Sequence, residues 1–189
     1  MKKTAVLIYD QFCNFEICVA LEILASYGKS MDVFAKTKEI VISEEGLKVS
    51  PDKTIYELDL DEYDSLLLSD AADIRFTVED VEIIEFIKKF DGKIIGAISI
   101  APILLVKAGM LNGKSFMIGA DKDDLLEEGY SEADLKYMKD WNDCIVNPIE
   151  EGYIVYENIV TSVSFEFVKF GIQFCKMLGI KISPKSFGL

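Results

Sequence analysis

Ser99 is the residue of this sequence best placed to do chemistry, because a buried strand precedes it and a helix follows it. The apolar run Ile94–Ile98 predicts a parallel strand, and Pro102 suits the first turn of a helix that ends near Gly109. A strand that turns at once into a helix holds one side chain at the carboxyl edge of the sheet, beside free backbone N–H groups. This is the arrangement of a nucleophile elbow, and here the elbow carries serine.

The composition excludes several other kinds of chemistry. The chain has no histidine, so Ser-His-Asp and Cys-His mechanisms within it are excluded, and the commonest metal ligand is absent. We expect neither a bound metal nor a cofactor. The chain carries 33 acidic and 20 basic residues, and its net charge of −13 argues against nucleic acids and anionic membranes as partners.

Length and hydropathy predict one domain. Half of the 189 residues are apolar, which is enough for a sizeable core, and we expect a single domain over residues 1–189. No apolar run approaches the length of a transmembrane helix. The four cysteines show no C-x-x-C spacing and are expected to be free thiols: Cys13, Cys18, Cys144 and Cys175. Together these features predict a soluble, cytoplasmic protein.

Strands that alternate with helices predict a doubly wound α/β domain around a parallel sheet. We expect strands at residues 5–9, 31–35, 65–68, 94–98, 115–118, 145–149, 153–156 and 159–162. We expect helices at 14–27, 77–87, 101–109 and 164–178, with N-caps at Asn14, Thr77 and Ser164. The last helix is apolar nearly all round, which is typical of a deeply buried helix or of half an interface.

Two additions and one converging edge complete the expected domain. Residues 40–49 predict a hairpin with Gly46 at its turn, and the charged segment Asp121–Asp140 predicts a solvated face. In doubly wound folds, ligands bind at the carboxyl ends of strands, near a switch in strand order. We expect Tyr9–Glu16, Leu68–Asp73 and Ile98–Ala101 to converge there.

In this order and at this spacing, several segments resemble the ThiJ/PfpI superfamily, the flavodoxin-like relatives of class I glutamine amidotransferases. The resemblance covers most of the chain. It is carried by Phe15-Glu16 at the start of the first long helix, by AISIAPILLVKAGMLNGK over the elbow, by Asp64–Leu68 and by Val160-Thr161-Ser162. It implies a flavodoxin-like three-layer sandwich with a mostly parallel central sheet, a small β-hairpin addition and a homodimer.

The resemblance also assigns positions to the site. Ser99 occupies the place of the family's reactive cysteine, and Glu16 that of the acidic residue that hydrogen-bonds it. The family turn L-P-G-G falls on Leu68–Ala71, where Asp70 and Ala71 replace both glycines. The histidine often found after the next strand falls at about Gly119. The Gly-Pro pair usual before the last helix is absent, and Val163-Ser164 takes its place.

Replacing cysteine by serine changes the chemistry. A cysteine with a pKa of about 8.5, lowered at a helix start, supplies thiolate at neutral pH, whereas a serine needs an adjacent base. Glu16, near its usual pKa of about 4.3, is a poor base unless burial raises that pKa, and its first-turn position favours the ionised form. Asp70 disturbs backbone donors that would hold an oxyanion and adds negative charge.

The candidate site residues therefore carry alternatives. The catalytic candidates are Ser99 and Glu16, and the ligand-binding candidates are Asp70, Ala71, Ile100 and Arg75. Asp70 and Asp73 are either turn residues or, with Glu16, an oxygen-only site for magnesium or calcium. Arg75 either clamps a ligand carboxylate or forms a surface ion pair. Cys13 and Cys18, which flank Glu16, are either structural or a displaced thiol.

Three functions follow from these alternatives. The leading interpretation is a divergent ThiJ/PfpI-like protein that has lost the cysteine chemistry and binds an unidentified small molecule or partner at the elbow. The second is a hydrolase, lyase or amidase-like enzyme that uses Ser99 with Glu16, and the third is a structural dimer subunit. The resemblance implies proteolysis, deglycation, glyoxalase-type or chaperone activity, and all but chaperoning depend on the absent cysteine.

Overall fold

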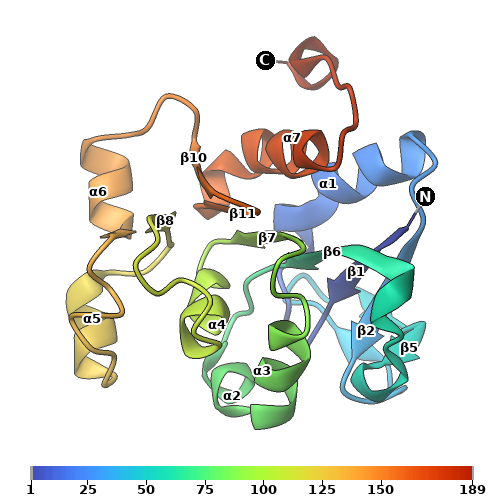
Figure 1. Ribbon diagram of the computed structural model, residues 1–189, viewed down its shortest axis with the longest axis horizontal. Helices are drawn as coiled ribbons and strands as arrows, with labels where there is room; N and C mark the ends of the chain where they lie inside the picture. Colours follow the sequence, from blue (N-terminus) through green and yellow to red (C-terminus); the bar gives the residue numbers. More distant parts are fainter. Residues whose placement is uncertain (1, 189) are drawn as a thin grey trace.

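The computed structural model describes residues 2–188 and is built on one seven-stranded sheet (Figure 1). The strand order is β10-β11-β7-β6-β1-β2-β5, and every neighbouring pair is parallel except β10 with β11. The predicted mostly parallel sheet is confirmed. The strands are Lys3–Leu7 (β1), Met31–Ala35 (β2), Lys53–Thr54 (β5), Tyr63–Leu68 (β6), Ile94–Ile98 (β7), Tyr153–Tyr156 (β10) and Ile159–Ser162 (β11).

The strand order reverses at β1. The chain adds β2 and β5 on one side of β1, then crosses to the other side to form β6 and β7. Leu7 of β1 pairs with Leu68 of β6, and Leu68 pairs with Ala97 of β7, so these three strands end at the same edge. This edge is the kind of switch point at which α/β folds bind ligands.

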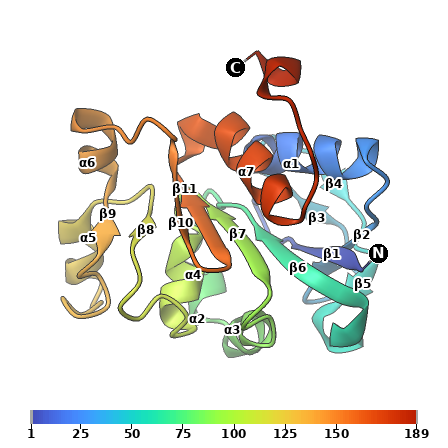
Figure 2. The ribbon, with the colours of Figure 1, turned by 45° about the horizontal axis from the view of Figure 1, so that its top comes forward.

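Helices cover both faces of the sheet, which confirms the three-layer sandwich (Figures 1 and 2). Helices α1 (Asn14–Ser26) and α7 (Phe167–Met177) lie side by side on one face. Helices α2 (Arg75–Glu79), α3 (Val81–Lys88) and α4 (Pro102–Lys107) cover the other face.

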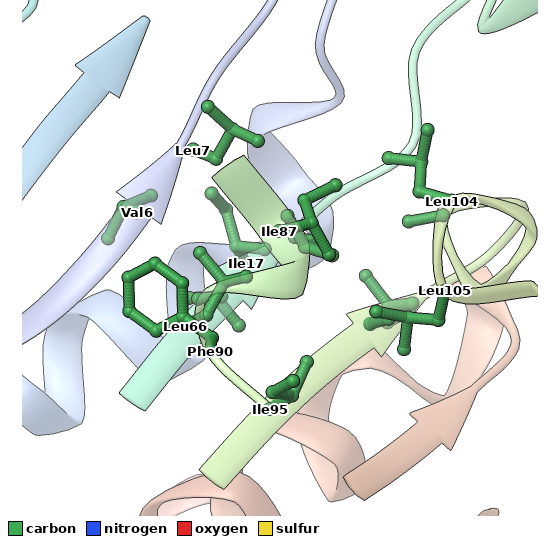
Figure 3. Close-up of a cluster of buried hydrophobic side chains, with 14 of the residues drawn as sticks. Val6, Leu7, Ile17, Leu66, Ile87, Phe90, Ile95, Leu104 and Leu105 are labelled. Atoms are coloured by element: carbon green, nitrogen blue, oxygen red, sulfur yellow. The ribbon is translucent and has the colours of Figure 1, made fainter. Parts of the chain in front are cut away.

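The core is continuous between the strands and the helices. Strands β6 and β7 are covered on both faces, which explains the apolar runs Leu66–Leu68 and Ile94–Ile98. Figure 3 shows part of this core, drawn from β1, β6, β7, α1, α3 and α4; its labelled side chains are Val6, Leu7, Ile17, Leu66, Ile87, Phe90, Ile95, Leu104 and Leu105.

Two glycines allow α7 to pack closely against its neighbours. A Cβ added to Gly171 would lie 2.8 Å from the backbone nitrogen of Ala20 in α1. A Cβ added to Gly96 in β7 would lie 2.7 Å from the ring of Phe174. The fully buried Phe170 and Phe174 show that much of the apolar surface of the last helix is used within the subunit.

Smaller elements surround the sheet. Strands β3 (Val41–Ile42) and β4 (Lys48–Val49) form the predicted hairpin, whose turn holds Gly46 at a φ of +87°. Strands β8 (Phe116–Met117) and β9 (Met138–Lys139) pair in parallel near α5 (Lys122–Glu127) and α6 (Trp141–Val146). Short 3-10 turns lie at Ile55–Glu57, Leu60–Glu62, Ser164–Glu166 and Pro184–Phe187. Within residues 2–188, no helix combines the length and hydropathy that crossing a bilayer requires.

The strand predicted at residues 145–149 is wrong. Its first two residues belong to α6, and the remainder lies outside any helix or strand. Asp140 caps this helix by accepting the backbone N–H of Asp143 at 2.8 Å, and Cys144 is buried beneath it. Capping and burial on the helical face therefore outweigh the β-branched character of Ile145 and Val146.

The predicted N-cap at Asn14 is also wrong. Asn14 is the first helical residue, and the cap position is Cys13, which makes no side-chain capping bond. Instead, the carboxylate of Glu45, in the turn of the hairpin, accepts the backbone N–H groups of Asn14 and Phe15 at 3.3 and 3.0 Å. A cap supplied by a residue 30 positions away in the sequence cannot be seen in local spacing.

The other two predicted caps are displaced by a few residues. Asp80 caps α3 by accepting the N–H of Glu82 at 3.0 Å, so the expected capping box at Thr77 is wrong. Ser164 opens the 3-10 turn Ser164–Glu166, and α7 starts after it.

Candidate functional site

Ser99 follows β7 directly and has a φ of +60°, in the left-handed region that non-glycine residues rarely adopt. Two backbone hydrogen bonds hold it there: its N–H donates to the carbonyl of Ser162 at 2.9 Å, and its carbonyl accepts from Gly119 at 2.7 Å. The side chain is 6% exposed. Ser99 thus occupies a strained, over-determined strand-to-helix turn, as a nucleophile elbow requires.

The Ser99 hydroxyl is bound by a carboxylate that belongs to Asp70. Its Oγ donates to Oδ2 of Asp70 at 2.9 Å. Glu16, in the first turn of α1, accepts the backbone N–H of Asp70 at 2.9 Å. The Ser99 hydroxyl also interacts with the Glu16 carboxyl, and this interaction acts to lower the pKa of Glu16. The structure therefore brings together side chains that follow β1, β6 and β7.

The Asp70 carboxylate takes up the hydrogen-bond donors of the elbow. Its Oδ1 accepts the backbone N–H of Ala71 at 2.6 Å, while Oδ2 accepts the Ser99 hydroxyl. The nearby backbone N–H of Ile100 also acts to lower the pKa of this carboxyl. In acyl-transfer enzymes, backbone N–H groups beside a nucleophile hold the oxyanion of the transition state. Here they hold a carboxylate of the same chain.

Burial raises the pKa of both carboxyl groups at the elbow. Glu16 is 2% exposed, and burial raises its pKa to about 8 although the N–H of Asp70 opposes the rise. The negative charge of Asp70 adds to the rise. Burial also raises the pKa of Asp70, against its bonds from Ser99 and Ala71. The expectation that the helix start keeps Glu16 at its ordinary acidity is wrong, because lost hydration outweighs the helix dipole.

Cys13 is the thiol that lies at this site, whereas Cys18 is half-buried further along α1. The sulfur of Cys13 and carboxylate oxygens of Glu16 and Asp70 all lie within 4.8 Å of one another. Burial raises the pKa of the Cys13 thiol as well as that of Glu16. Near neutral pH two of the three groups hold protons, which makes them poor ligands for a cation.

Asp73 is engaged elsewhere. Nε and Nη2 of Arg75 donate to its two carboxylate oxygens at 2.8 and 2.6 Å, and this pairing lowers the pKa of Asp73 to about 2. The Arg75 side chain is 74% exposed. The cation site considered for Asp73 with Glu16 and Asp70 is therefore not assembled, and Arg75 forms a surface ion pair.

Gly119 borders the elbow at the position where the family often has histidine. A Cβ added there would lie 3.1 Å from the Ser99 Oγ and 3.2 Å from its carbonyl carbon. A side chain at this position would press directly on the hydroxyl.

A groove of about 610 Å³ opens beside the elbow and is lined by residues of α2, α4 and α5 and of the segment after α5. Ile100, the residue after Ser99, lines it, and so does Arg75. Ser99, Glu16 and Asp70 are not part of its lining. The lining is Ile74, Arg75, Val78, Glu79, Ile100, Ile103, Val106, Lys107, Leu125, Glu128, Gly129, Tyr130 and Asp134.

The sequence did not predict that the segment after Asp121 forms one wall of this groove. The segment Asp121–Asp140 reads as a solvated face because of its charges, but Leu125 is 2% exposed and Tyr130 is half-buried. Leu125 and Tyr130 are apolar residues within a charged run, and they could have indicated that this segment packs against the domain.

Comparison with known proteins places this geometry in context. A profile of the DJ-1/PfpI family matches residues 2–177. An uncharacterized protein of Methanocaldococcus jannaschii is 24% identical over 185 residues, which cover 94% of this chain and 84% of that protein. A deglycase of Pyrococcus abyssi is 25% identical over 143 residues, which cover 74% of this chain and 86% of that protein.

Solved structures show the same fold at low identity. A DJ-1 superfamily protein from Agrobacterium tumefaciens matches with a TM-score of 0.79 at 19% identity, over 100% of this chain and 95% of that one. A two-domain protein from Anabaena variabilis, with DJ-1/ThiJ/PfpI-like and ferritin-like domains, matches with a TM-score of 0.76 at 20% identity. That match covers 95% of this chain but 48% of the other, so this chain spans about half of that protein.

Proposed function

We propose that this chain, which belongs to the DJ-1/PfpI family, is a non-catalytic member that binds a small molecule in the groove beside its elbow. The observation that carries the proposal is the position of the Asp70 carboxylate. It is bound to the Ser99 hydroxyl and to the N–H group of Ala71, and the nearby N–H of Ile100 favours its ionised form. The donors that would stabilise a reacting oxyanion already have an anionic partner.

The charge at this position opposes nucleophilic catalysis. An attacking serine must transfer its proton to a base while negative charge develops on the substrate oxygen. Asp70 places a carboxylate where that negative charge would develop. Losing a single oxyanion-hole donor typically costs about 10²- to 10³-fold in rate, and replacing the hole by a negative charge costs more.

The deglycase activity named for the Pyrococcus abyssi relative is not carried over to this chain. The family resemblance ties that chemistry to a cysteine at the elbow, and Ser99 stands at that position. A hydroxyl lacks the thiolate that such chemistry uses at neutral pH. The burial of Ser99 at 6% exposure also restricts access to it.

The groove supports the binding part of the proposal. Its volume of about 610 Å³ lies within the range of roughly 300–1,000 Å³ that small-molecule sites occupy. It adjoins the elbow through Ile100, so a ligand there rests next to the turn that the family uses for chemistry. A non-catalytic protein that keeps this turn retains a rigid wall for the groove.

A second candidate is a hydrolase in which Asp70 takes the proton of Ser99, and the 2.9 Å hydrogen bond between them favours it. One experiment separates the two. Wild type and Ser99→Ala are treated with a fluorophosphonate probe and with other serine-directed electrophiles, and adducts are read by intact mass. We expect no adduct on Ser99. Stoichiometric labelling of wild type that disappears in Ser99→Ala would establish the hydrolase instead.

A further inference from the structure

The groove beside the elbow has an apolar floor and a charged rim. Ile100, Ile103 and Leu125 come from three different segments, and all three line it. Leu125 and Ile103 are each 2% exposed and are held in place by their neighbours, whereas Ile100 is half-buried and offers more of its surface to the groove. The rim is polar, and the balance of its charges decides which ligand it suits.

Both cations of the rim are already paired. Arg75 holds Asp73 through two hydrogen bonds of 2.8 and 2.6 Å. The Nζ of Lys107 lies 2.8 Å from a carboxylate oxygen of Glu79. Neither cation is free to attract an anionic ligand without giving up its present partner.

Two carboxylates of the rim have no such partner. Within residues 2–188, no lysine or arginine nitrogen lies within 4.0 Å of Glu128 or Asp134. Asp134 accepts hydrogen bonds from Ser131, through its hydroxyl at 2.6 Å and its N–H at 3.3 Å. Arg75 interacts with Glu128 at longer range while it stays bound to Asp73. Three carboxylates against two cations still give the lining a net negative charge.

Tyr130 belongs to the same groove as these carboxylates. It lines the groove, and its ring is half-buried. Burial raises the pKa of its hydroxyl to about 12, and the charges of Glu128 and Glu79 add to that rise. A phenol ring in a negative field, next to an apolar surface, is the environment that attracts an organic ammonium group.

We propose that the groove binds a small organic cation, with its ammonium group against Tyr130 and Glu128 and its apolar body on Ile100 and Ile103. This inference rests on the proposed function and names the ligand class of the same site. An anion of the same shape meets Glu128 and Asp134 and is repelled. An uncharged analogue gains the apolar contacts alone.

Three probes with one apolar body test the charge preference: 2-phenylethylamine, 2-phenylethanol and phenylacetate. Binding to the full-length protein is followed by shifts of backbone amide resonances and by calorimetry. We expect the amine to bind most tightly, the alcohol more weakly and the carboxylate least. We also expect added salt to weaken the amine selectively.

A matched pair of variants locates the charge. Glu128→Gln removes a rim carboxylate, and Glu127→Gln removes the same charge from the adjacent residue, which does not line the groove. We expect Glu128→Gln to weaken amine binding about two- to fivefold, the size of an exposed ion pair, and Glu127→Gln to leave it nearly unchanged.

The outcomes separate this inference from the proposed function. If the alcohol or the carboxylate binds as tightly as the amine, or if Glu128→Gln has no effect, the cation preference is overturned while the binding groove stands. If none of the three compounds shifts the groove resonances, the ligand class is likewise overturned. Labelling of Ser99 by the serine-directed electrophiles overturns the non-catalytic function itself.

Discussion

Removing the carboxylate of Asp70 is expected to restore reactivity to a nucleophile at the elbow. The perturbation compares Ser99→Cys with the double variant Ser99→Cys/Asp70→Gly, which restores the cysteine and one glycine of the family turn. In the single variant, the introduced sulfur lies beside a carboxylate that now contacts the Ser99 Oγ at 2.9 Å. A neighbouring negative charge and burial both disfavour a thiolate.

The expected size follows from the separation of the two charges. Two unit charges about 4 Å apart interact by about 4 kcal/mol at an effective dielectric constant of about 20, which sets an upper limit near three pKa units. Burial raises the pKa of Asp70 and so opposes its charged form, which reduces this effect. We therefore expect the double variant to lower the pKa of the introduced thiol by at least about one unit, which is about tenfold in thiolate.

The assay is alkylation by iodoacetamide as a function of pH, followed by intact mass, with wild type as the baseline for the four native cysteines. The control is Ser99→Cys/Asp73→Ala, which removes a carboxylate three residues away that is bound to Arg75. We expect the rate-pH curve of the Asp70 double variant to move to lower pH and that of the control to stay with the single variant. Equal curves for the Asp70 variant and the single variant would refute the view that Asp70 blocks this site.

Three further predictions concern stability. Burial raises the pKa of Glu16 to about 8 from an ordinary 4.5, so the folded state keeps a proton that the unfolded state releases. The free energy of unfolding of wild type should therefore fall as pH rises from about 5 to 8, by at most about 1.4 kcal/mol per pH unit. Glu16→Gln should flatten this slope, as measured by urea unfolding at each pH. A wild-type curve that rises with pH would contradict this. Gly96→Ala should lower the free energy of unfolding by about 1–3 kcal/mol, because the added methyl group would lie 2.7 Å from the Phe174 ring. An unchanged melting temperature would show that the ring moves aside freely. Glu45→Ala should lower the free energy of unfolding by about 0.5–2 kcal/mol, because it removes the cap of α1. Glu39→Ala removes the same charge nearby in the sequence and should lower the free energy of unfolding less. Equal decreases for the two variants would mean that the cap contributes nothing.

The regular part of the fold was predictable because its signals are local. The apolar run Ile94–Ile98 followed by Pro102 predicted the β7 strand and the turn into α4, and both are present. Gly109 and Gly46 were expected to end a helix and to form a hairpin turn, and they have φ angles of +74° and +87°. In each case the residue type and its immediate neighbours determine the backbone.

The parts that were missed depend on contacts distant in the sequence. Glu45 caps α1 from a separate hairpin, and nothing near Asn14 indicates it. The pKa of Glu16 depends on how deeply the sheet and Asp70 bury it, which helix position does not reveal. The resemblance placed Asp70 at a replaced glycine, but only the structure shows which donors its carboxylate binds.

A single methylene group links the Asp70 carboxylate to the backbone, next to the donors that this carboxylate binds. A free anion that competes for the same donors must therefore displace a covalently attached carboxylate. The effective concentration of that carboxylate exceeds the concentration of millimolar metabolites by orders of magnitude. The elbow should consequently be insensitive to the concentrations of acetate, phosphate or other small anions around it. Under the proposed function, the groove then determines what this protein binds, and the elbow acts as a fixed part of its wall.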